Sequence, residues 1–348
     1  MFDINNILRK NIKNLIPYSS ARDEFKGEAS VYLDANENAF GSPLDTAYNR
    51  YPDPLQYAVK KRLSEIKGVP PRNIFLGNGS DEAIDILFRS FCNPGVDNVI
   101  IVPPTYGMYE VSANINDVAL RRVPLSAEYQ LNMEGIAEAI DAHTKMIFIC
   151  SPNNPTGNSI DRDDVETLLV NFNGLVVVDE AYINFSRQKT FIQELTEYAN
   201  LVVLQTLSKA WGLAGLRIGM AFASEEIIEV MNKVKPPYNI NEASQQLALR
   251  ALGNIDQVNG WIKETLNQRD KLVLELKKFD FVLDIYPSDA NFILVKTTDA
   301  RGIYNFLVQH GIIVRDRSKI QLCEGALRIT IGTPEENGKL IDTLKTFK

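Results

Sequence analysis

The chain has 348 residues, of which 45% are hydrophobic and 23% are charged, and its formal net charge is −7. This length exceeds the usual size of one hydrophobic core, so it predicts two domains or one large α/β domain with an appendage; the negative charge leaves no overall positive field that would draw the chain to nucleic acid or anionic lipid. The two histidines exclude a histidine-rich metal site, and three widely spaced cysteines (Cys92, Cys150 and Cys323) favour reduced thiols over a disulfide framework.

Residues 1–30 are expected to form an N-terminal arm that packs on the small domain or on a second subunit. The first residues, MFDINNILRKNIKNL, carry charges and amides among their apolar positions and so differ from the apolar core of a signal peptide. No later apolar stretch is long enough to span a bilayer. We therefore expect a cytoplasmic protein.

Residues 31–240 are expected to form a large domain around a mostly parallel central sheet. From about Leu76 to Ala223, short apolar runs (NVIIV, MIFIC, LVVVD, LVVLQ and RIGMAFA) alternate with polar segments. Two of these segments, DEAIDILFRSF and DRDDVETLLVNF, have helical spacing and acidic residues near their starts. The alternation is typical of buried parallel strands in a layered α/β fold, where ligands bind at the carboxyl ends of the strands.

Residues 241–348 are expected to form a smaller α+β domain. Two amphipathic helical segments follow Pro236-Pro237, namely NEASQQLALRAL and the run from Asp256 to Lys278. The apolar runs FVLDIYP and NFILVKT come next, then a helical segment near residues 300–310, and then IIVRD and LRITIG. The change from short buried runs to long helices places the domain boundary near residue 240.

The most informative stretch is TLSKAWGLAGLRIGM, which directly follows the apolar run LVVLQ. It places Lys209 just after a buried strand, where an enclosed site lowers the pKa of an amine and makes it available for Schiff-base chemistry. Thr206, Ser208 and Arg217 can hold a phosphate, because hydroxyls donate hydrogen bonds and a guanidinium binds two oxygens at once.

Three other strand ends carry candidate partners for this lysine. LVVVDEAY ends with Asp179, a carboxylate that can keep a pyridine nitrogen protonated, and has Tyr182 three residues later. The turn SPNNPTG is expected to project Asn153 as a neutral donor. Tyr106 follows a strand in VPPTYGMYE and is either a ring that stacks on a ligand or a core tyrosine.

A further candidate lies in IFLGNGSDEAIDIL, which predicts a strand, a glycine-containing turn and the start of a helix. The backbone N–H groups around Ser80 and Asp81 would face a phosphate at that helix N-terminus. The segment lacks the glycine spacing and the downstream acid of a dinucleotide-binding fingerprint.

Together these segments resemble the fold-type I, aspartate-aminotransferase-like family of pyridoxal-phosphate enzymes over nearly the whole chain. SPNNPTG and SKAWGLAGLRIG mark the family, and PYSSAR and GIIVRD resemble its histidinol-phosphate branch. The other matching segments are LDANENAFGSP, RYPDP, GNGSDEAID, PPTYGMY, VVDEAYINF and LRITIGT. Trp211 departs from the family, in which phenylalanine is common at this position.

The resemblance implies pyridoxal 5'-phosphate as the cofactor and gives each matching residue a role. Lys209 would carry the cofactor, Asp179 would pair with its pyridine nitrogen, and Tyr106 would stack on its ring. The implied contacts of the phosphate are Ser80, Asp81, Thr206, Ser208, Arg217 and, across a homodimer interface, Tyr51, and those of the phenolate oxygen are Asn153 and Tyr182. On the substrate side, Arg328 would hold the α-carboxylate, Arg315 would be a second anion-binding arginine, and Tyr18 and Asn36 would lie beside them.

The expected activity is a ping-pong transfer of an amino group from L-histidinol phosphate to 2-oxoglutarate in histidine biosynthesis, with the cofactor alternating between pyridoxal and pyridoxamine phosphate. Lys209 is expected to move the proton alone, in keeping with the shortage of histidines. Three alternatives stay open: an aromatic or aspartate-type aminotransferase, a threonine-phosphate decarboxylase of cobalamin synthesis, and a pyridoxal-dependent regulator. The regulator would need a DNA-binding module, and the acidic chain shows no such segment before the family match.

Overall fold

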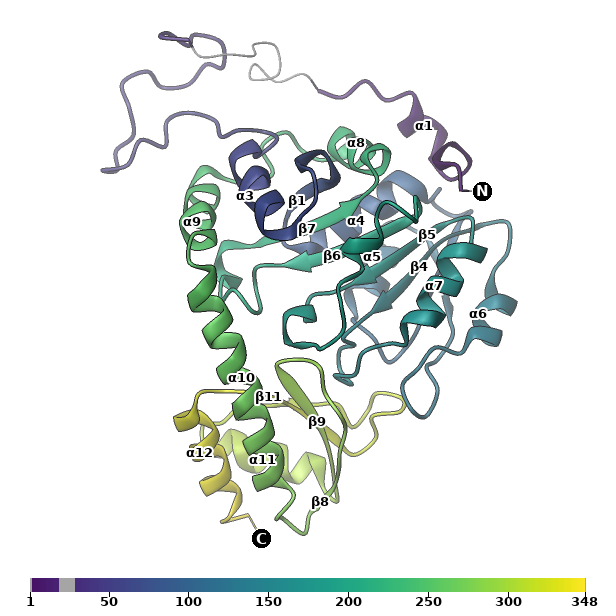
Figure 1. The fold of residues 1–348 in the computed structure, drawn as a ribbon, viewed down its shortest axis with the longest axis vertical. Coiled ribbons are helices and arrows are strands. Elements are labelled where there is room, and N and C mark those ends of the chain that lie inside the picture. The colour runs from purple at the N-terminus through teal and green to yellow at the C-terminus, as the bar shows by residue number, and fades with distance from the viewer. Residues whose placement is uncertain (1, 19–28, 348) are drawn as a thin grey trace.

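The structure is a computed structural model that describes residues 2–18 and 29–347 (Figure 1). Two sheets lie in different parts of the chain, the larger one between residues 74 and 223 and the smaller one between 282 and 330. The strands are β1 (Ile74–Asn78), β2 (Asn98–Ile101), β3 (Ala119–Arg122), β4 (Thr144–Cys150), β5 (Leu175–Asp179), β6 (Leu201–Thr206), β7 (Ile218–Ala223), β8 (Val282–Ile285), β9 (Phe292–Thr297), β10 (Arg315–Asp316) and β11 (Ala326–Thr330). The α-helices are α1 (Lys10–Lys13), α3 (Tyr57–Lys67), α4 (Ser80–Phe91), α5 (Met108–Ile115), α6 (Met133–Ala139), α7 (Arg162–Asn171), α8 (Glu225–Val234), α9 (Glu242–Leu252), α10 (Ile255–Leu276), α11 (Ala300–Gln309) and α12 (Pro334–Leu344).

The large sheet has seven strands in the order β1-β7-β6-β5-β4-β2-β3. Strands β2 to β6 pair in parallel, which confirms the predicted α/β class with a mostly parallel central sheet. The prediction that RIGMAFA is also a parallel strand is wrong, because β7 runs antiparallel to both β1 and β6. Residues 207–217 contain only a short 3-10 turn and no crossover α-helix, so the chain turns back beside β6.

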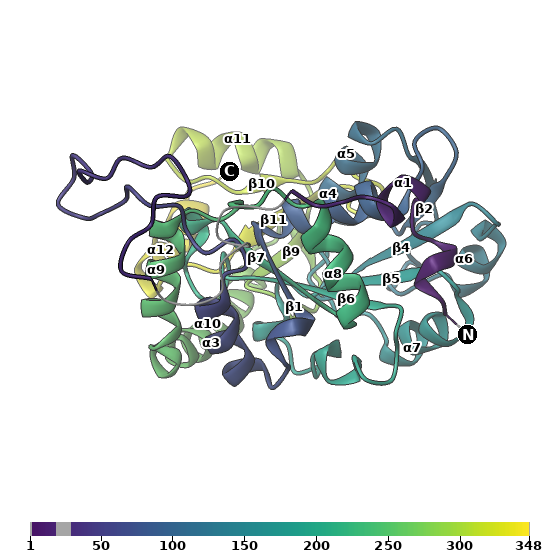
Figure 2. The same ribbon diagram turned by 90° about the horizontal axis from the view of Figure 1, so that it is seen from above.

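Both faces of the large sheet are covered by helices (Figure 2). Along β5, Leu175 and Val177 join one hydrophobic cluster with α4, α5 and α8, whereas Val176 and Val178 join another with α3, α6, α7 and α9. Because side chains alternate between the two faces of a strand, every position of β5 is buried. This explains why the central strands read as continuous apolar runs in the sequence.

The small sheet is antiparallel, with the strand order β10-β11-β9-β8. One of its faces packs on α10, α11 and α12 through residues such as Ile293, Val295 and Leu327. Leu294 and Ala326 point the other way and join the cluster of the large sheet. One face of the small sheet is therefore turned toward the large one.

The described part of the N-terminal arm packs on the large sheet's helices. Ile4 and Ile7 join the hydrophobic cluster that contains α4, and the Arg9 guanidinium donates to the Arg89 carbonyl at 2.7 Å. Of the two expected packing partners, the small domain is therefore wrong for the start of the arm, packing on a second subunit stays a prediction, and residues 19–28 lie outside the described ones. In the described chain, no helix combines the length and apolar character needed to cross a membrane.

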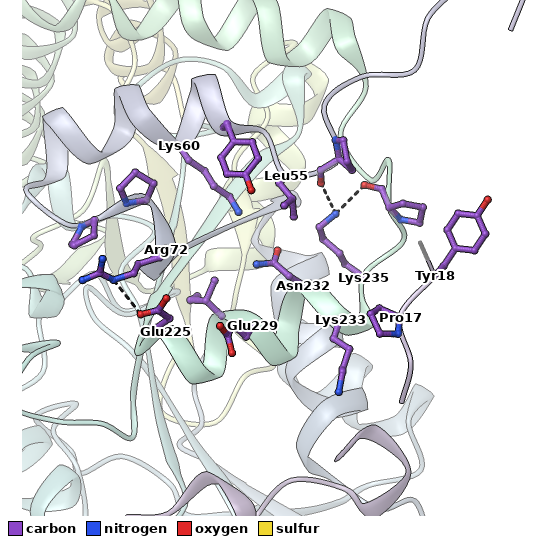
Figure 3. A pocket seen from close by; sticks show the side chains of 16 residues that line it. Pro17, Tyr18, Leu55, Lys60, Arg72, Glu225, Glu229, Asn232, Lys233 and Lys235 are labelled. Carbon is purple, nitrogen blue, oxygen red and sulfur yellow. Dashed lines mark hydrogen bonds and ion pairs between the residues drawn. The ribbon is translucent and has the colours of Figure 1, made fainter. Parts of the chain in front are cut away.

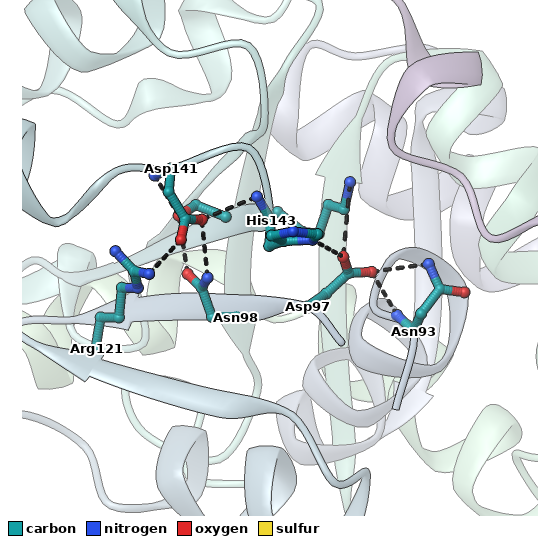
Figure 4. A network of polar contacts seen from close by, with 8 residues as sticks. Asn93, Asp97, Asn98, Arg121, Asp141 and His143 are labelled. Carbon is teal, nitrogen blue, oxygen red and sulfur yellow. Dashed lines mark hydrogen bonds and ion pairs between the residues drawn. The ribbon is translucent and has the colours of Figure 1, made fainter. Parts of the chain in front are cut away.

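A polar network fixes the amino ends of β2 and β4 (Figure 4). Asp97 accepts hydrogen bonds from the backbone and side-chain nitrogens of Asn93 at 2.6 and 2.8 Å, and its carboxylate lies 3.8 Å from the nearest ring nitrogen of His143. Asp141 accepts from Asn98 at 3.0 Å, and this hydrogen bond is the main reason that its pKa falls to about 2. His143 thus belongs to the amino edge of the sheet, while His310 contacts Phe306 at the end of α11.

Candidate active site

A cavity opens at the carboxyl ends of the strands of the large sheet. It brings together nine of the residues predicted from the sequence, namely Ser80, Asp81, Tyr106, Asp179, Tyr182, Thr206, Ser208, Lys209 and Arg217, and also Cys150, Asn154 and Ala181. All but Arg217 lie at or after the ends of β1, β2, β4, β5 or β6 and meet because these carboxyl ends lie at a common edge, whereas Arg217 directly precedes the antiparallel β7 at the same edge. Among the described residues, no group of three or more His, Cys, Asp or Glu side chains could hold a metal ion.

Lys209 lies three residues after the end of β6, and its ammonium sits 5.5 Å from the centre of the Tyr182 ring. The side chain is exposed in this chain, yet its ammonium end lies among protein atoms that lower its pKa. Loss of solvation is the main cause, and the positive charges of Arg328 and Arg217 act in the same direction against the opposing charge of Asp179. Lys209 is therefore biased toward the neutral amine.

Asp179 ends β5 and is only 2% exposed. It accepts a hydrogen bond from the Tyr109 hydroxyl at 2.8 Å and another from the Ala181 backbone at 3.0 Å. Burial raises the pKa of Asp179 to about 6, and these two hydrogen bonds oppose the shift. Tyr109 was not predicted as a site residue, although its position three residues after Tyr106, near the start of α5, could have suggested it.

A cup of polar groups that could hold an anion lines the same cavity as Lys209. Ser80 begins α4, the Thr206 and Ser208 hydroxyls lie 2.9 Å apart, and Arg217 adds a guanidinium. α4 approaches β7 so closely that a Cβ on Gly219 would lie 2.0 Å from the Ser80 nitrogen. The glycine therefore allows the first turn of α4, with its free backbone N–H groups, to reach the cavity.

Asp81 organises this cup through its carboxylate. One carboxylate oxygen accepts from the Tyr106 hydroxyl at 2.9 Å, and the other lies 3.4 Å from the Arg217 guanidinium. Asp81 thus holds both the tyrosine ring and the arginine, in addition to the backbone role predicted from the sequence. Burial, followed by the charge of Asp81, raises the pKa of Tyr106, so its hydroxyl stays protonated.

The structure differs from the prediction at the two adjacent asparagines of SPNNPTG. Asn153 points away from the cavity, because its amide donates to the Pro104 carbonyl at 2.8 Å and to the Thr156 hydroxyl at 2.7 Å. Asn154 lines the cavity instead and lies 3.4 Å from the Tyr182 hydroxyl. The expectation that Asn153 projects into the cavity is therefore wrong, and Asn154 occupies that place.

Arg328 reaches this asparagine from the small sheet. Its guanidinium donates to the Asn154 side-chain oxygen and lies 5.1 Å from the centre of the Phe292 ring. Arg315 stands opposite Arg328 in the β10–β11 ladder and is exposed. The two predicted anion-binding arginines are therefore neighbours in space, and Arg328 directly contacts a residue of the cavity.

Three further predicted residues, Asn36, Tyr51 and Tyr18, line other cavities of the single chain. Asn36 and Tyr51 line a separate cavity of about 540 Å³, where Tyr51 stacks on Tyr238 with ring centres 4.5 Å apart. Tyr18 lies with Pro17 at a larger cavity of about 890 Å³, which α8 and the start of α3 help to line (Figure 3). These three residues thus do not line the cavity that contains Lys209 within one chain.

The chemistry of the cavity fits pyridoxal phosphate. The cup supplies hydroxyls, backbone N–H groups and a guanidinium for a phosphate. Across the cavity, Asp179 offers a buried carboxylate for a protonated ring nitrogen, and Lys209 offers an amine of lowered pKa for an aldehyde.

Comparisons with known proteins agree with this chemistry. The sequence matches the family described as aminotransferase class I and II over residues 32–344. A histidinol-phosphate aminotransferase from Cytophaga hutchinsonii is 56% identical over 346 residues, which cover 99% of both chains. Another from Parabacteroides distasonis is 53% identical over 348 residues, which cover 100% of both.

Solved structures share the fold. The histidinol-phosphate aminotransferase from Sinorhizobium meliloti in complex with pyridoxal-5'-phosphate has a TM-score of 0.78 at 24% identity, covering 89% of this chain and 88% of that one. The L-threonine-O-3-phosphate decarboxylase from Porphyromonas gingivalis has a TM-score of 0.74 at 23% identity, covering 86% and 91%. These structural likenesses confirm the fold-type I architecture, which is common to both activities.

Proposed function

Because this chain belongs to the aminotransferase class I and II family, we propose that it transfers the amino group of L-histidinol phosphate to 2-oxoglutarate, a step of histidine biosynthesis. The products are imidazole-acetol phosphate and L-glutamate. The observation that carries the proposed reaction is the meeting of Lys209, Asp179 and Arg217 in one cavity. The proposed substrate rests on full-length relatives at 51–56% identity that are named for this reaction.

We assign pyridoxal phosphate to the cavity as the cofactor, and when bound it supplies an electron sink that makes the carbon bearing the amino group acidic. The phosphate would be held by Ser80, Thr206, Ser208 and Arg217, and Tyr106 would lie against the ring. Asn154, in place of Asn153, and Tyr182 would bind the phenolate oxygen, because their side chains already lie within 3.4 Å of each other.

Lys209 is the proposed proton carrier. As a neutral amine, its Nζ can take a proton from the carbon that bears the donor's amino group and release it again in the same half of the reaction. Asp179 would stay ionised above its pKa of about 6 and thus keep a ring nitrogen protonated. Neither imidazole is given a part in this transfer, because His143 and His310 do not line the cavity.

Arg328 and Arg315 are the proposed anchors for the anionic groups of the two amino donors. The geometry of a guanidinium suits both phosphate and carboxylate oxygens. One pair of arginines can therefore bind both the phosphorylated donor and glutamate. An aromatic or aspartate-type aminotransferase would keep the cofactor residues and change this pocket. A threonine-phosphate decarboxylase would share the need for a phosphate anchor, so substrate assays separate these alternatives.

A homodimer with shared active sites is part of the proposal. Residues 29–52 contain no helix or strand and run along the outside of the molecule (Figure 1). They expose large apolar side chains, namely Val31, Leu33, Phe40 and Leu44. A second copy of the chain would cover these side chains. Tyr51 of one copy would then complete the phosphate cup of the other copy, and Tyr18 and Asn36 would approach the substrate of that other copy.

We also propose the division of the chain into an arm (1–30), a large domain (31–240) and a small domain (241–348). The two separate sheets and the long helix α10, which leads into the smaller one, support this division. A cytoplasmic location is proposed as well, and the three buried, free cysteines fit a reducing compartment.

The test is an aminotransferase assay of the purified protein with histidinol phosphate, phenylalanine and aspartate as donors, together with carbon dioxide release from threonine phosphate. Histidinol phosphate should be the fastest donor, and borohydride reduction should fix the cofactor to the peptide that contains Lys209. Faster conversion of phenylalanine or aspartate, or carbon dioxide release without a keto acid, would reject the assignment. A label on another lysine would reject the site.

A further inference from the structure

Three arginines project from one face of the small sheet. Arg315 pairs with Arg328 in the antiparallel ladder, and the Arg317 backbone N–H donates to the Ala326 carbonyl at 2.9 Å, which continues the same register. Residues paired across an antiparallel ladder, and residues two positions apart on one strand, share a face. Arg315, Arg317 and Arg328 therefore lie on the same side, and the small side chain of Ala326 leaves room opposite Arg317.

This face is the one turned toward the active site. Leu294 pairs with Arg328, and Leu294 and Ala326 pack in the cluster of the large sheet. The alternating residues Val314 and Leu327 pack instead under the helices of the small sheet. The proximity of Arg317 to the cavity is also visible in its electrostatics, since Tyr182 is among the groups that influence its pKa.

Within residues 2–18 and 29–347, no acid forms an ion pair with Arg315, Arg317 or Arg328, although the charge of Asp316 also acts on Arg317. Asp316 points the other way, where it pairs with Arg301 at 3.2 Å and accepts from the Ser318 backbone at 2.9 Å. Among the described residues, the side chain of Arg317 has no hydrogen-bond or ion-pair partner, and its Nε is buried. Burial and the neighbouring charge of Arg315 lower the pKa of this guanidinium, as expected where like charges are held together.

We propose that Arg317 is a third arginine of the substrate-anion site and that it selects the phosphorylated amino donor over the dicarboxylate donor. This inference rests on the proposed function. A phosphate monoester carries nearly two negative charges at neutral pH and has three terminal oxygens, whereas a carboxylate has one charge and two oxygens. Two N–H groups of one guanidinium, from Arg328 or Arg315, can bind both oxygens of a carboxylate. A phosphate then still has one oxygen and one charge that a further guanidinium can bind.

The test compares the two amino donors in single-turnover measurements on the cofactor-loaded Arg317→Gln variant. The apparent dissociation constant for histidinol phosphate should rise about 10- to 100-fold, the loss expected for one charge-assisted hydrogen bond. The limiting rate, and the dissociation constant for glutamate, should change by less than about threefold. Arg317→Lys should recover part of the affinity, since it keeps the charge without the fork.

Arg301→Gln is the matched control, because it removes an equal charge on the other side of Asp316 and should leave both donors unaffected. Competition by inorganic phosphate gives a second readout, and it should weaken in Arg317→Gln even if histidinol phosphate is not the natural donor. An equal loss with both donors, or no loss with either, overturns the proposal. If the wild-type enzyme rejects histidinol phosphate, the proposed function fails, while phosphate competition still decides the role of Arg317.

Discussion

Replacing Asp179 by asparagine is expected to stabilise the cofactor-free protein while abolishing transamination. The carboxyl group lies in a site where burial raises its pKa to about 6 from its ordinary value of 3.8. An asparagine has the same shape and keeps an acceptor for the Ala181 backbone, and the Tyr109 hydroxyl can turn to accept from the new amide. The substitution therefore removes a buried charge without opening a cavity.

The size of the effect follows from the shift in pKa. A difference of about two units corresponds to about 3 kcal/mol, because each unit is worth about 1.4 kcal/mol. The folded state holds this proton more tightly than the unfolded chain does. Ionisation of Asp179 therefore lowers the free energy of unfolding by this full amount above about pH 7. The loss becomes smaller as the pH falls through about 6, and it disappears below about pH 4.

The assay is urea denaturation of both proteins without cofactor at a series of pH values. Asp179→Asn should be more stable than the wild type by about 3 kcal/mol near pH 8, and the two curves should converge near pH 4. A variant that is less stable near pH 8, or a difference that does not depend on pH, would refute the reasoning. Asp141→Asn is the control of opposite sign, because the pKa of Asp141 is lowered to about 2 and its ionised form stabilises the fold.

Four further substitutions test the site. Tyr109→Phe removes a hydrogen-bond donor to the Asp179 carboxylate, which should raise the pKa of Asp179 further. The pH below which the apoprotein loses affinity for the cofactor should therefore rise by about one to two units. Asn154→Ala should lower kcat/KM by about 10- to 100-fold, whereas Asn153→Ala should mainly lower the melting temperature, since its amide holds the loop. Gly219→Ala should weaken cofactor retention in dialysis at least about tenfold, because its Cβ would displace the start of α4.

Much of the fold could be predicted because burial on both faces leaves a direct trace in the sequence. The runs that form β4, β5 and β6 are apolar at nearly every position, since their side chains alternate between two covered faces. The direction of β7 left no such trace. A strand buried on both faces reads the same in either direction, and only the short connection after β6 requires the chain to return antiparallel.

The site was predictable where a residue directly follows a strand. Lys209 and Asp179 fall in the cavity because the strand ends converge there. The sequence could not show which of the two adjacent asparagines, Asn153 or Asn154, faces the cavity. Their orientation depends on the Pro104 carbonyl, which lies in another loop and accepts from Asn153. Arg317 was missed because its significance comes from the pairing of β10 with β11, which brings together residues far apart in the chain.

The two sheets carry two different parts of the proposed site. Residues that would hold the cofactor come from the strand ends of the large sheet, and the arginines that would choose the substrate come from the face of the small one. The two sets meet where Arg328 donates to Asn154. Substitutions on β10 can therefore alter the recognition of the substrate without touching the cofactor residues, whereas Arg328 on β11 links the two sets, because it contacts Asn154 and its charge lowers the pKa of Lys209.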